Sequence, residues 1–292
     1  PSTFLAEALD TPATELAAPP DPAARLAPPA PALPAGPGRR ARRAGAPLAL
    51  SYSQLDDYLA CPERYRLRHV VGVPTPTHHA LSYGSAMHAA VAAFHLRRAA
   101  GREMTEPELK AAFAAAWTGE GFLSRQHEEA RFAAGWQALR TFREQQLALP
   151  AQTVAIEKPF SFAVGRDLVR GRIDRLDATE VGTVIVDYKS SNVPEQAKAD
   201  ARARESLQLR IYALAHEAET GSLPQQVQLH FLDSATIGHA SPQREQLDKA
   251  LVQIATAADG IRGGDFAPRP NPIACGYCPF RDICSASAAK VA

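Results

Sequence analysis

The fold is decided by two segments: Gly171-Arg172-Ile173-Asp174-Arg175 and, after a turn, Val184-Ile185-Val186-Asp187-Tyr188-Lys189. Apolar and polar residues alternate through the first segment, and the second begins as a buried-strand run, so both are expected to be β-strands. With a turn centred between residues 180 and 181, the strands form an antiparallel hairpin in which Asp174 lies directly opposite Asp187. Side chains alternate between the two faces of a strand, so Lys189 shares a face with Asp187. The hairpin therefore brings together two carboxylates and an ammonium group.

This combination points to phosphodiester chemistry. Two like charges opposed across a hairpin destabilise it unless a cation lies between them. Carboxylate oxygens suit Mg²⁺ or Mn²⁺, and a metal held by Asp174 and Asp187 would polarise a phosphoryl oxygen and acidify a bound water. Lys189 would orient that water and stabilise charge developing on the phosphate. On the pattern alone, the alternative is a surface ion pair of Asp174 and Lys189 at the end of a buried strand.

The rest of the chain alternates between helical and strand periodicity. Residues 153–164, 167–177 and 183–190 are predicted to form a three-stranded antiparallel meander. The region before it is helical, with Ser53 as an N-cap, Asp56 as its capping-box acid, and a break and restart at Cys61-Pro62. This order indicates an α/β domain, with a small mixed sheet flanked by helices and a helical N-terminal part. The other predicted elements are helices at about 84–100 (opened by Gly84-Ser85), 106–117, 126–147, 199–219 and 243–263, and a strand at 226–233.

Residues 1–47 differ in composition from the remainder. Eleven of the 24 prolines precede Leu48, among alanines, other small residues and scattered charges. Such a segment buries too little apolar surface to offset the entropy lost on ordering, so it is predicted to be a linker or tail. The folded domain is then expected to span residues 48–292.

Bulk properties leave the partner of the domain open. The net charge of +1 neither demands nor excludes a nucleic acid. The sequence contains no apolar run of about 18 residues and no signal-peptide pattern, so no membrane span and a cytoplasmic location are expected. The P-loop pattern is also missing, so any ATP-driven motor would have to lie outside this chain.

The four cysteines are Cys61, Cys275, Cys278 and Cys284. They are too few for the disulfide framework of a secreted protein. The last three follow a Cys-x-x-Cys-x5-Cys spacing that is typical of a metal-binding loop, and Cys61 would join them from the other end of the domain. Four thiolates hold either zinc or an iron–sulfur cluster, and spacing alone does not choose between them. We therefore expect a metal staple between the first helix and the last segment.

Several of these features, in this order, resemble the RecB-type branch of the PD-(D/E)XK nucleases. They are Gly84-Ser85-Ala86-Met87-His88, Gly171-x-x-Asp174, Asp187-Tyr188-Lys189-Ser190 and Gln208-x-x-x-Tyr212, and the cysteines match the subset that carries a cluster. The resemblance spans residues 51 to 284. It implies a restriction-endonuclease-like core, cleavage of DNA with Mg²⁺ or Mn²⁺, and a 4Fe-4S cluster in preference to zinc.

The resemblance also implies roles for individual residues. His88 becomes a metal ligand, together with Asp174, Asp187 and the main-chain carbonyl of Tyr188. Gln208 and Tyr212 would lie near the active site and contact substrate or Lys189. Ala92 is a departure, because such helices often carry a glutamate at this position. His95 lies two turns beyond His88 on the same helix face but lacks the preceding glycine.

Three more residues are interpreted from their positions. Arg172 and Arg175 flank Asp174 and are expected to contact DNA phosphates, which fixes position without reading sequence. Glu157 on the neighbouring strand is expected to be a surface residue, with a supporting role at the metal site as the alternative.

The main functional hypothesis is the nuclease module of a RecB- or UvrD-like helicase–nuclease in DNA repair, acting on single-stranded DNA ends. The proline-rich leader would tether it to an upstream helicase. One alternative is a free-standing exonuclease of the CRISPR-associated or exonuclease V kind. Another is a catalytically inactive nuclease fold that binds DNA, and a zinc-stapled interaction domain is a further one.

Overall fold

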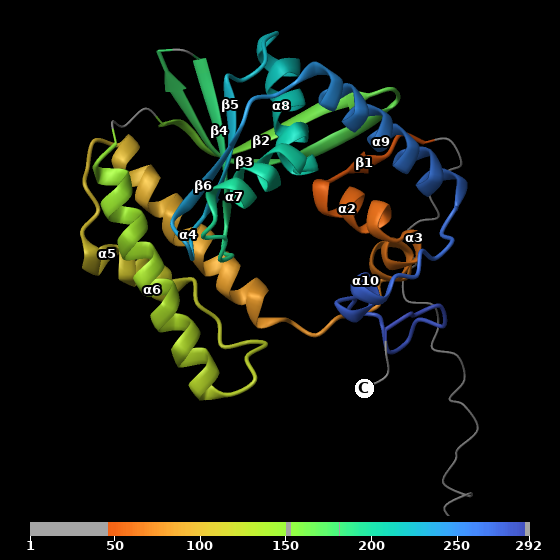
Figure 1. Ribbon diagram of the computed structural model, residues 1–292, viewed down its shortest axis with the longest axis horizontal. Coiled ribbons are helices and arrows are strands. Elements are labelled where there is room, and N and C mark those ends of the chain that lie inside the picture. The colour runs from red at the N-terminus through yellow and green to blue at the C-terminus, as the bar shows by residue number, and fades with distance from the viewer. Residues whose placement is uncertain (1–45, 150–152, 181, 290–292) are drawn as a thin grey trace, which may run out of the picture. The chain divides into compact units, whose positions relative to one another are not determined.

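A computed structural model describes residues 46–149, 153–180 and 182–289. Within this part of the chain, the strands form one mixed sheet with helices on both faces (Figure 1). The predicted α/β class with a mixed sheet is therefore confirmed. The predicted tail lies outside the described residues, apart from Ala46 and Pro47.

The predicted antiparallel meander is present. It consists of β2 (Thr153–Val164), β3 (Asp167–Thr179) and β4 (Gly182–Lys189). The sheet continues from β4 to a parallel β5 (Gln226–Phe231) and then to an antiparallel β6 (Thr236–Ala240). A short β1 (Ala49–Leu50) pairs in parallel with β3 at Leu168 and Val169.

The register of the β3–β4 hairpin is the predicted one. Arg175 pairs with Val186 and Thr179 with Gly182, so the next step along the ladder would bring Asp174 opposite Asp187. Pairing between β3 and β4 ends at Arg175. On the same edge of β3, pairing resumes only at Val169, where β1 is the partner. In the described part of the chain, residues 170–174 of β3 thus lack a ladder partner on this edge, while β2 covers the other edge. This gap in the ladder positions Asp174.

Two helical layers enclose the sheet. One core joins it to α2 (Tyr52–Ala60), α8 (Leu207–Thr220) and α9 (Arg244–Gly263). The other core lies against the opposite face, where Val186 and Tyr188 of β4 pack on α4 (His79–Ala99), α5 (Glu106–Ala115) and α6 (Arg125–Leu147). The remaining elements are α3 (Pro62–Tyr65), a π-helix η2 (Arg66–Val71), α7 (Gln196–Glu205) and α10 (Pro272–Gly276).

Two predicted helix starts are wrong. The first helix is capped by Ser51, not Ser53, and its capping-box partner is Gln54, whose side chain accepts from the Ser51 main-chain N–H. Helix α4 begins at His79, five residues before the predicted Gly84, because the His78 ring caps it by accepting from Ala80 N. The predicted restart of the helix at Pro62 is confirmed.

The helix predicted at 199–219 is two helices. They meet at Ser206, which has an extended backbone, ends α7 and caps α8 by accepting from Leu209 N. The predicted stop at Gly221 is confirmed, since Gly221 takes a left-handed conformation at φ 76°. Strands β1 and β6 were not predicted. The two residues of β1 are too few to show a period, and Gly238 interrupts the alternation in β6.

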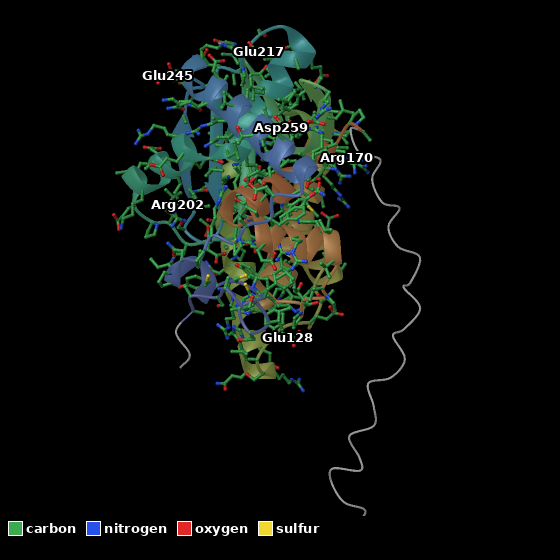
Figure 2. All side chains as sticks on the ribbon, turned by 90° about the vertical axis from the view of Figure 1, so that its right-hand side faces the viewer. Glu128, Arg170, Arg202, Glu217, Glu245 and Asp259 are labelled. Atoms are coloured by element: carbon green, nitrogen blue, oxygen red, sulfur yellow. The ribbon has the colours of Figure 1, made fainter. Side chains whose placement is uncertain are left out.

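None of the helices in the described ranges is long and apolar enough for a transmembrane span. Charged side chains of both signs project from the surface in Figure 2, among them Arg170, Arg202, Glu245 and Asp259.

Candidate functional site

Asp174 lies where β3 and β4 diverge. Its Oδ2 accepts a hydrogen bond of 2.9 Å from the main-chain N–H of Tyr188. This contact replaces the ladder hydrogen bond that the strands would otherwise make, so the carboxylate is inserted between the two strands. The Asp174 side chain is only 13% exposed.

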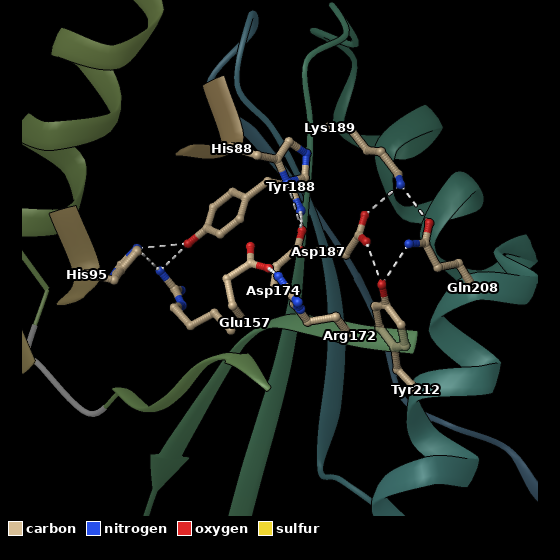
Figure 3. A network of polar contacts seen from close by, with 11 residues as sticks. His88, His95, Glu157, Arg172, Asp174, Asp187, Tyr188, Lys189, Gln208 and Tyr212 are labelled. Carbon is tan, nitrogen blue, oxygen red and sulfur yellow. Dashed lines mark hydrogen bonds and ion pairs between the residues drawn. The ribbon is translucent and has the colours of Figure 1, made fainter. Parts of the chain in front are cut away.

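Asp187 and Lys189 face α8, on the same side of β4, as strand alternation predicts. Lys189 Nζ lies 2.8 Å from Asp187 Oδ2 and donates to Gln208 Oε1 at 2.7 Å. Gln208 Nε2 in turn donates to Tyr212 Oη at 2.7 Å, and Tyr212 Oη donates to Asp187 Oδ1 at 3.3 Å. The four predicted residues thus form one closed ring of polar contacts (Figure 3). Gln208 and Tyr212 take part together because they lie one helical turn apart on α8.

His88 approaches from the other helical layer. Its Nδ1 lies 3.4 Å from Asp174 Oδ2. One turn earlier, a Cβ at position 84 would lie 3.2 Å from Ser190 Oγ, so Gly84 allows α4 to come close to the end of β4. This close approach gives the Gly84–His88 spacing a physical reason.

Glu157 of β2 completes this group and was undervalued from the sequence. One donor atom each from His88, Glu157 and Asp174 lie within 4.8 Å of one another. Glu157 has a left-handed backbone at φ 51°, which is uncommon for a residue other than glycine and typical of functional sites. Its side chain is also 3.3 Å from Arg172 Nη1. A single backbone angle turns it towards the site, and the residue pattern carries no signal for that angle.

Burial and charge perturb the carboxylate of Asp174. Burial, followed by the negative charge of Asp187, raises its pKa to about 6, against the opposing effects of His88 and the Tyr188 N–H. Burial also raises the pKa of the Tyr212 hydroxyl, and the charges of Asp187 and Asp174 add to the shift, so this hydroxyl stays protonated and can donate. Two carboxylates held close together at a partly buried site favour binding of a cation.

The donor set fits a divalent metal. Carboxylate oxygens with one imidazole nitrogen are ligands for Mg²⁺, Mn²⁺ and related ions. Asp187 points towards the same region, but in this structure its oxygens contact Lys189 and Tyr212. Tyr188 contributes its main chain at this place, while its ring lies on the α4 face.

Arg175 does not reach this site, and its predicted contact with DNA is wrong. Its side chain is buried on the α4 face of the sheet, where Asp177 and Tyr188 bind the guanidinium. A guanidinium that is buried on this face and bound by Asp177 and Tyr188 cannot contact a phosphate. Arg172 is exposed and next to Glu157, so it remains a candidate. His95, two turns beyond His88, is buried next to Arg175.

The four cysteines line one pocket. Cys61, at the end of α2, lines the same pocket as Cys275, Cys278 and Cys284. The Cys61 sulfur accepts a hydrogen bond from Arg269 N at 3.4 Å. Main-chain N–H groups of Ala288 and Asn271 lower the pKa of the Cys275 thiol. The four cysteines therefore share one pocket, although no three of their sulfurs lie within 4.8 Å of one another in this part of the described chain.

The chain is similar to several known proteins. The model of the PD-(D/E)XK nuclease superfamily matches residues 49–285. The gene 69 proteins of Mycobacterium phage D29 and Mycobacterium phage L5 are 25% and 23% identical to the chain, and each alignment covers 80% of the chain and 95% of the phage protein. A solved structure of a candidate exonuclease from Eubacterium rectale is 13% identical, covers 84% of this chain and 91% of its own, and has a TM-score of 0.49.

Proposed function

The chain belongs to the PD-(D/E)XK nuclease superfamily, and we propose that it is a deoxyribonuclease that uses Mg²⁺ or Mn²⁺ to hydrolyse phosphodiester bonds in the cytoplasm. The observation that carries this proposal is the convergence of His88, Glu157 and Asp174 beside the Asp187–Lys189 pair. Metal-ligating groups and a positioned cation at one place are what hydrolysis of a phosphodiester needs.

The metal would be held by His88, Asp174, Asp187 and the main-chain carbonyl of Tyr188, with Glu157 as a further ligand. When bound, it supplies Lewis-acid polarisation of the phosphate and a more acidic water. The role of Lys189 follows from its contacts. Asp187 and Gln208 fix its ammonium group, which can then stabilise negative charge on the phosphate without losing side-chain entropy during the reaction.

Gln208 and Tyr212 support this arrangement from α8. Tyr212 keeps its proton and donates to Asp187, while Gln208 links Tyr212 to Lys189. We propose that the two residues orient Asp187 and Lys189, and that Arg172 contacts a phosphate of the bound strand.

End-labelled single- and double-stranded DNA, incubated with Mg²⁺ or Mn²⁺ or with a chelator, tests the proposal. We expect metal-dependent cleavage, faster on single-stranded ends, that is lost in Asp187→Ala. A surface variant, Asp259→Ala, should cut like the wild type, because Asp259 is 75% exposed. Equal cleavage by wild type and Asp187→Ala would contradict the site, and faster cleavage of intact duplex would contradict the strand preference.

We further propose that the cysteine pocket holds a 4Fe-4S cluster. Four sulfurs from both ends of the domain line a single cavity, which supports a shared metal. Zinc would bind the same donors. Protein purified without oxygen is expected to contain iron and sulfide and to show the brown absorbance of a cluster. A stoichiometric zinc content with no iron would contradict the cluster.

Two kinds of protein are candidates for the setting in which this domain acts. A module of a DNA-repair helicase–nuclease is the first, with an upstream helicase as its partner. The phage relatives favour the second, a free-standing nuclease, because the matched region makes up 95% of their own length and leaves no room in them for a motor. Cleavage by the isolated chain without ATP would support the second candidate. Dependence of cleavage on an added helicase and ATP would support the first.

A further inference from the structure

A second polar cluster lies behind the candidate site, on the α4 face of the sheet. Its centre is the Arg175 guanidinium, which is 6% exposed. Nη1 of Arg175 lies 2.6 Å from Tyr188 Oη, 2.8 Å from His95 Nε2 and 2.9 Å from Gln146 Oε1, and Nη2 lies 3.0 Å from Asp177 Oδ2. These partners belong to β3, β4, α4 and α6. One cation therefore joins four elements directly behind the metal-binding side chains.

The donors and acceptors that meet at Nη1 fit together in one arrangement, whereas Arg175 Nε, His95 Nδ1 and Gln146 Nε2 are buried without a hydrogen-bond partner among the described residues. Nη1 carries two hydrogens, which it can donate to Tyr188 Oη and Gln146 Oε1. The Tyr188 hydroxyl, 2.9 Å from His95 Nε2, is then left to donate to the imidazole. A neutral His95 accepts this hydrogen bond, which agrees with its position beside a guanidinium. The result is a chain of hydrogen bonds from β3 through β4 to α4.

This chain of bonds is one of several contacts that align α4 with the end of the sheet. Gly84, His88 and His95 are spaced four and seven residues apart, so they share one face of the helix. Gly84 meets Ser190. His88 meets Asp174, and His95 meets Tyr188 (Figure 3). His88 lies between the other two contacts. Its distance from Asp174 therefore depends on how both ends of this face are held.

Stability alone does not call for such a cluster. A buried ion pair is often matched or exceeded in stability by apolar residues of similar volume. Both Val186 and Phe142 show that this core accepts apolar side chains at neighbouring positions. A role in fixing the geometry of the site explains the buried cation better.

We propose that Arg175, His95 and the Tyr188 hydroxyl are positioning residues that set the affinity of the site for its divalent cation. They act by holding α4 against β3 and β4, so that His88 and the Tyr188 main chain keep their places around Asp174. The inference rests on the proposed function in taking His88 and Asp174 as ligands. Groups that orient metal ligands typically contribute about 10- to 100-fold in metal affinity.

The test is a Mn²⁺ titration followed by electron paramagnetic resonance, beside thermal unfolding without metal. Tyr188→Phe removes one oxygen and leaves the main chain and ring in place. His95→Leu removes the acceptor, whereas His95→Gln can restore one. Val91→Ala is the matched control, because Val91 is a buried apolar residue on α4 outside the cluster.

We expect Tyr188→Phe and His95→Leu to weaken Mn²⁺ binding by about tenfold or more. His95→Gln should recover most of the Mn²⁺ affinity. Val91→Ala should lower the unfolding temperature but leave the Mn²⁺ affinity unchanged. Cleavage by Tyr188→Phe should return at saturating Mn²⁺. Wild-type affinity in Tyr188→Phe, or an equal loss in Val91→Ala, would overturn the inference. Failure of the wild type to bind Mn²⁺ would instead overturn the proposed function on which it rests.

Discussion

At the scale of single residues, the site is a balance between carboxylates and the cations that neutralise them. Asp187 is 1% exposed and pairs with Lys189, while Glu157 lies beside Arg172. Asp174 has His88 at 3.4 Å, but burial and the nearby charge of Asp187 disfavour its ionised form and raise its pKa. A divalent cation would relieve this repulsion.

Asp174→Asn should therefore stabilise the protein without metal. The pKa of Asp174 is raised from 3.8 to about 6. An acid whose pKa is raised in the folded state contributes its full stability below its unfolded pKa. This contribution is lost as pH rises through about 6. At pH 8, the free energy of unfolding of Asp174→Asn should thus exceed that of the wild type by about 1–3 kcal/mol. This difference should vanish near pH 4. With Mn²⁺ the order should reverse, because only the wild type gains binding energy.

Urea unfolding at both pH values, with and without Mn²⁺, measures this effect. Asp248→Asn, an exposed acid on α9, serves as the control and should change little. A metal-free Asp174→Asn protein that is less stable than the wild type at pH 8 would contradict the assigned repulsion.

Arg172→Gln should act on metal and DNA with opposite signs. Arg172 contacts Glu157, so its removal should tighten Mn²⁺ binding, while the loss of a phosphate contact should weaken DNA binding. The dependence of log affinity for DNA on log salt should fall by about one unit. Arg170→Gln, at an exposed position two residues away on β3, should leave Mn²⁺ affinity unchanged. Identical Mn²⁺ affinities in the two variants would exclude the competition between Arg172 and metal.

At the scale of elements, the positions of chemical groups were predictable where a regular period repeats. The hairpin register and the Gln208–Tyr212 pair both follow from strand or helix geometry, and both are observed. Glu157 and Arg175 were misjudged because their placement depends on tertiary structure. A local left-handed backbone turns Glu157 inward, and the packing of α4 and α6 buries Arg175. Neither cause leaves a trace in a window of neighbouring residues.

The join between α2 and the following turns depends on one buried acid. Asp57 is 1% exposed and accepts from Arg68 at 2.9 Å, with Arg64 at 2.7 Å and His69 at 2.8 Å. Asp57→Asn should lower the free energy of unfolding by about 3 kcal/mol, because the buried centre of the cluster loses its charge. The neighbouring Asp56→Asn, at an exposed position on the same helix, should change it by less than about 0.5 kcal/mol. Chemical denaturation compares the two, and equal stabilities would contradict the structural role of Asp57.

At the scale of the whole domain, the first and last segments of the described chain are held together at several points. Tyr58 Oη donates to Asp265 O at 2.7 Å, and Arg269 Nη1 donates to Leu59 O at 3.1 Å. Asp167 of β3 links the two segments indirectly, because it accepts from Leu48 N and pairs with Arg262. The cysteine pocket lies at the end of this seam. A metal there would close nearly the whole domain into a ring, which restricts the unfolded chain.

Cys278→Ala should therefore affect folding more than chemistry. We expect loss of bound metal, a lower unfolding temperature and faster proteolysis near α10, with Mn²⁺ affinity at the Asp174 site kept in the protein that remains folded. Ser285→Ala, next to Cys284 in the same loop, is the control. An unchanged unfolding temperature together with complete loss of cluster metal would show that the cysteines do not staple the domain.

The central claim, that the Asp174–Asp187–Lys189 site cuts DNA, is tested most directly by single-turnover cleavage in Lys189→Met alongside its Mn²⁺ affinity. We predict that cleavage of an end-labelled single strand falls by about 10²- to 10⁴-fold. Mn²⁺ should bind at least as tightly as in the wild type, because Asp187 loses its competing cation. Lys198→Met, an exposed control at 66% exposure, should cut normally. Cleavage by Lys189→Met at the wild-type rate would contradict the claim.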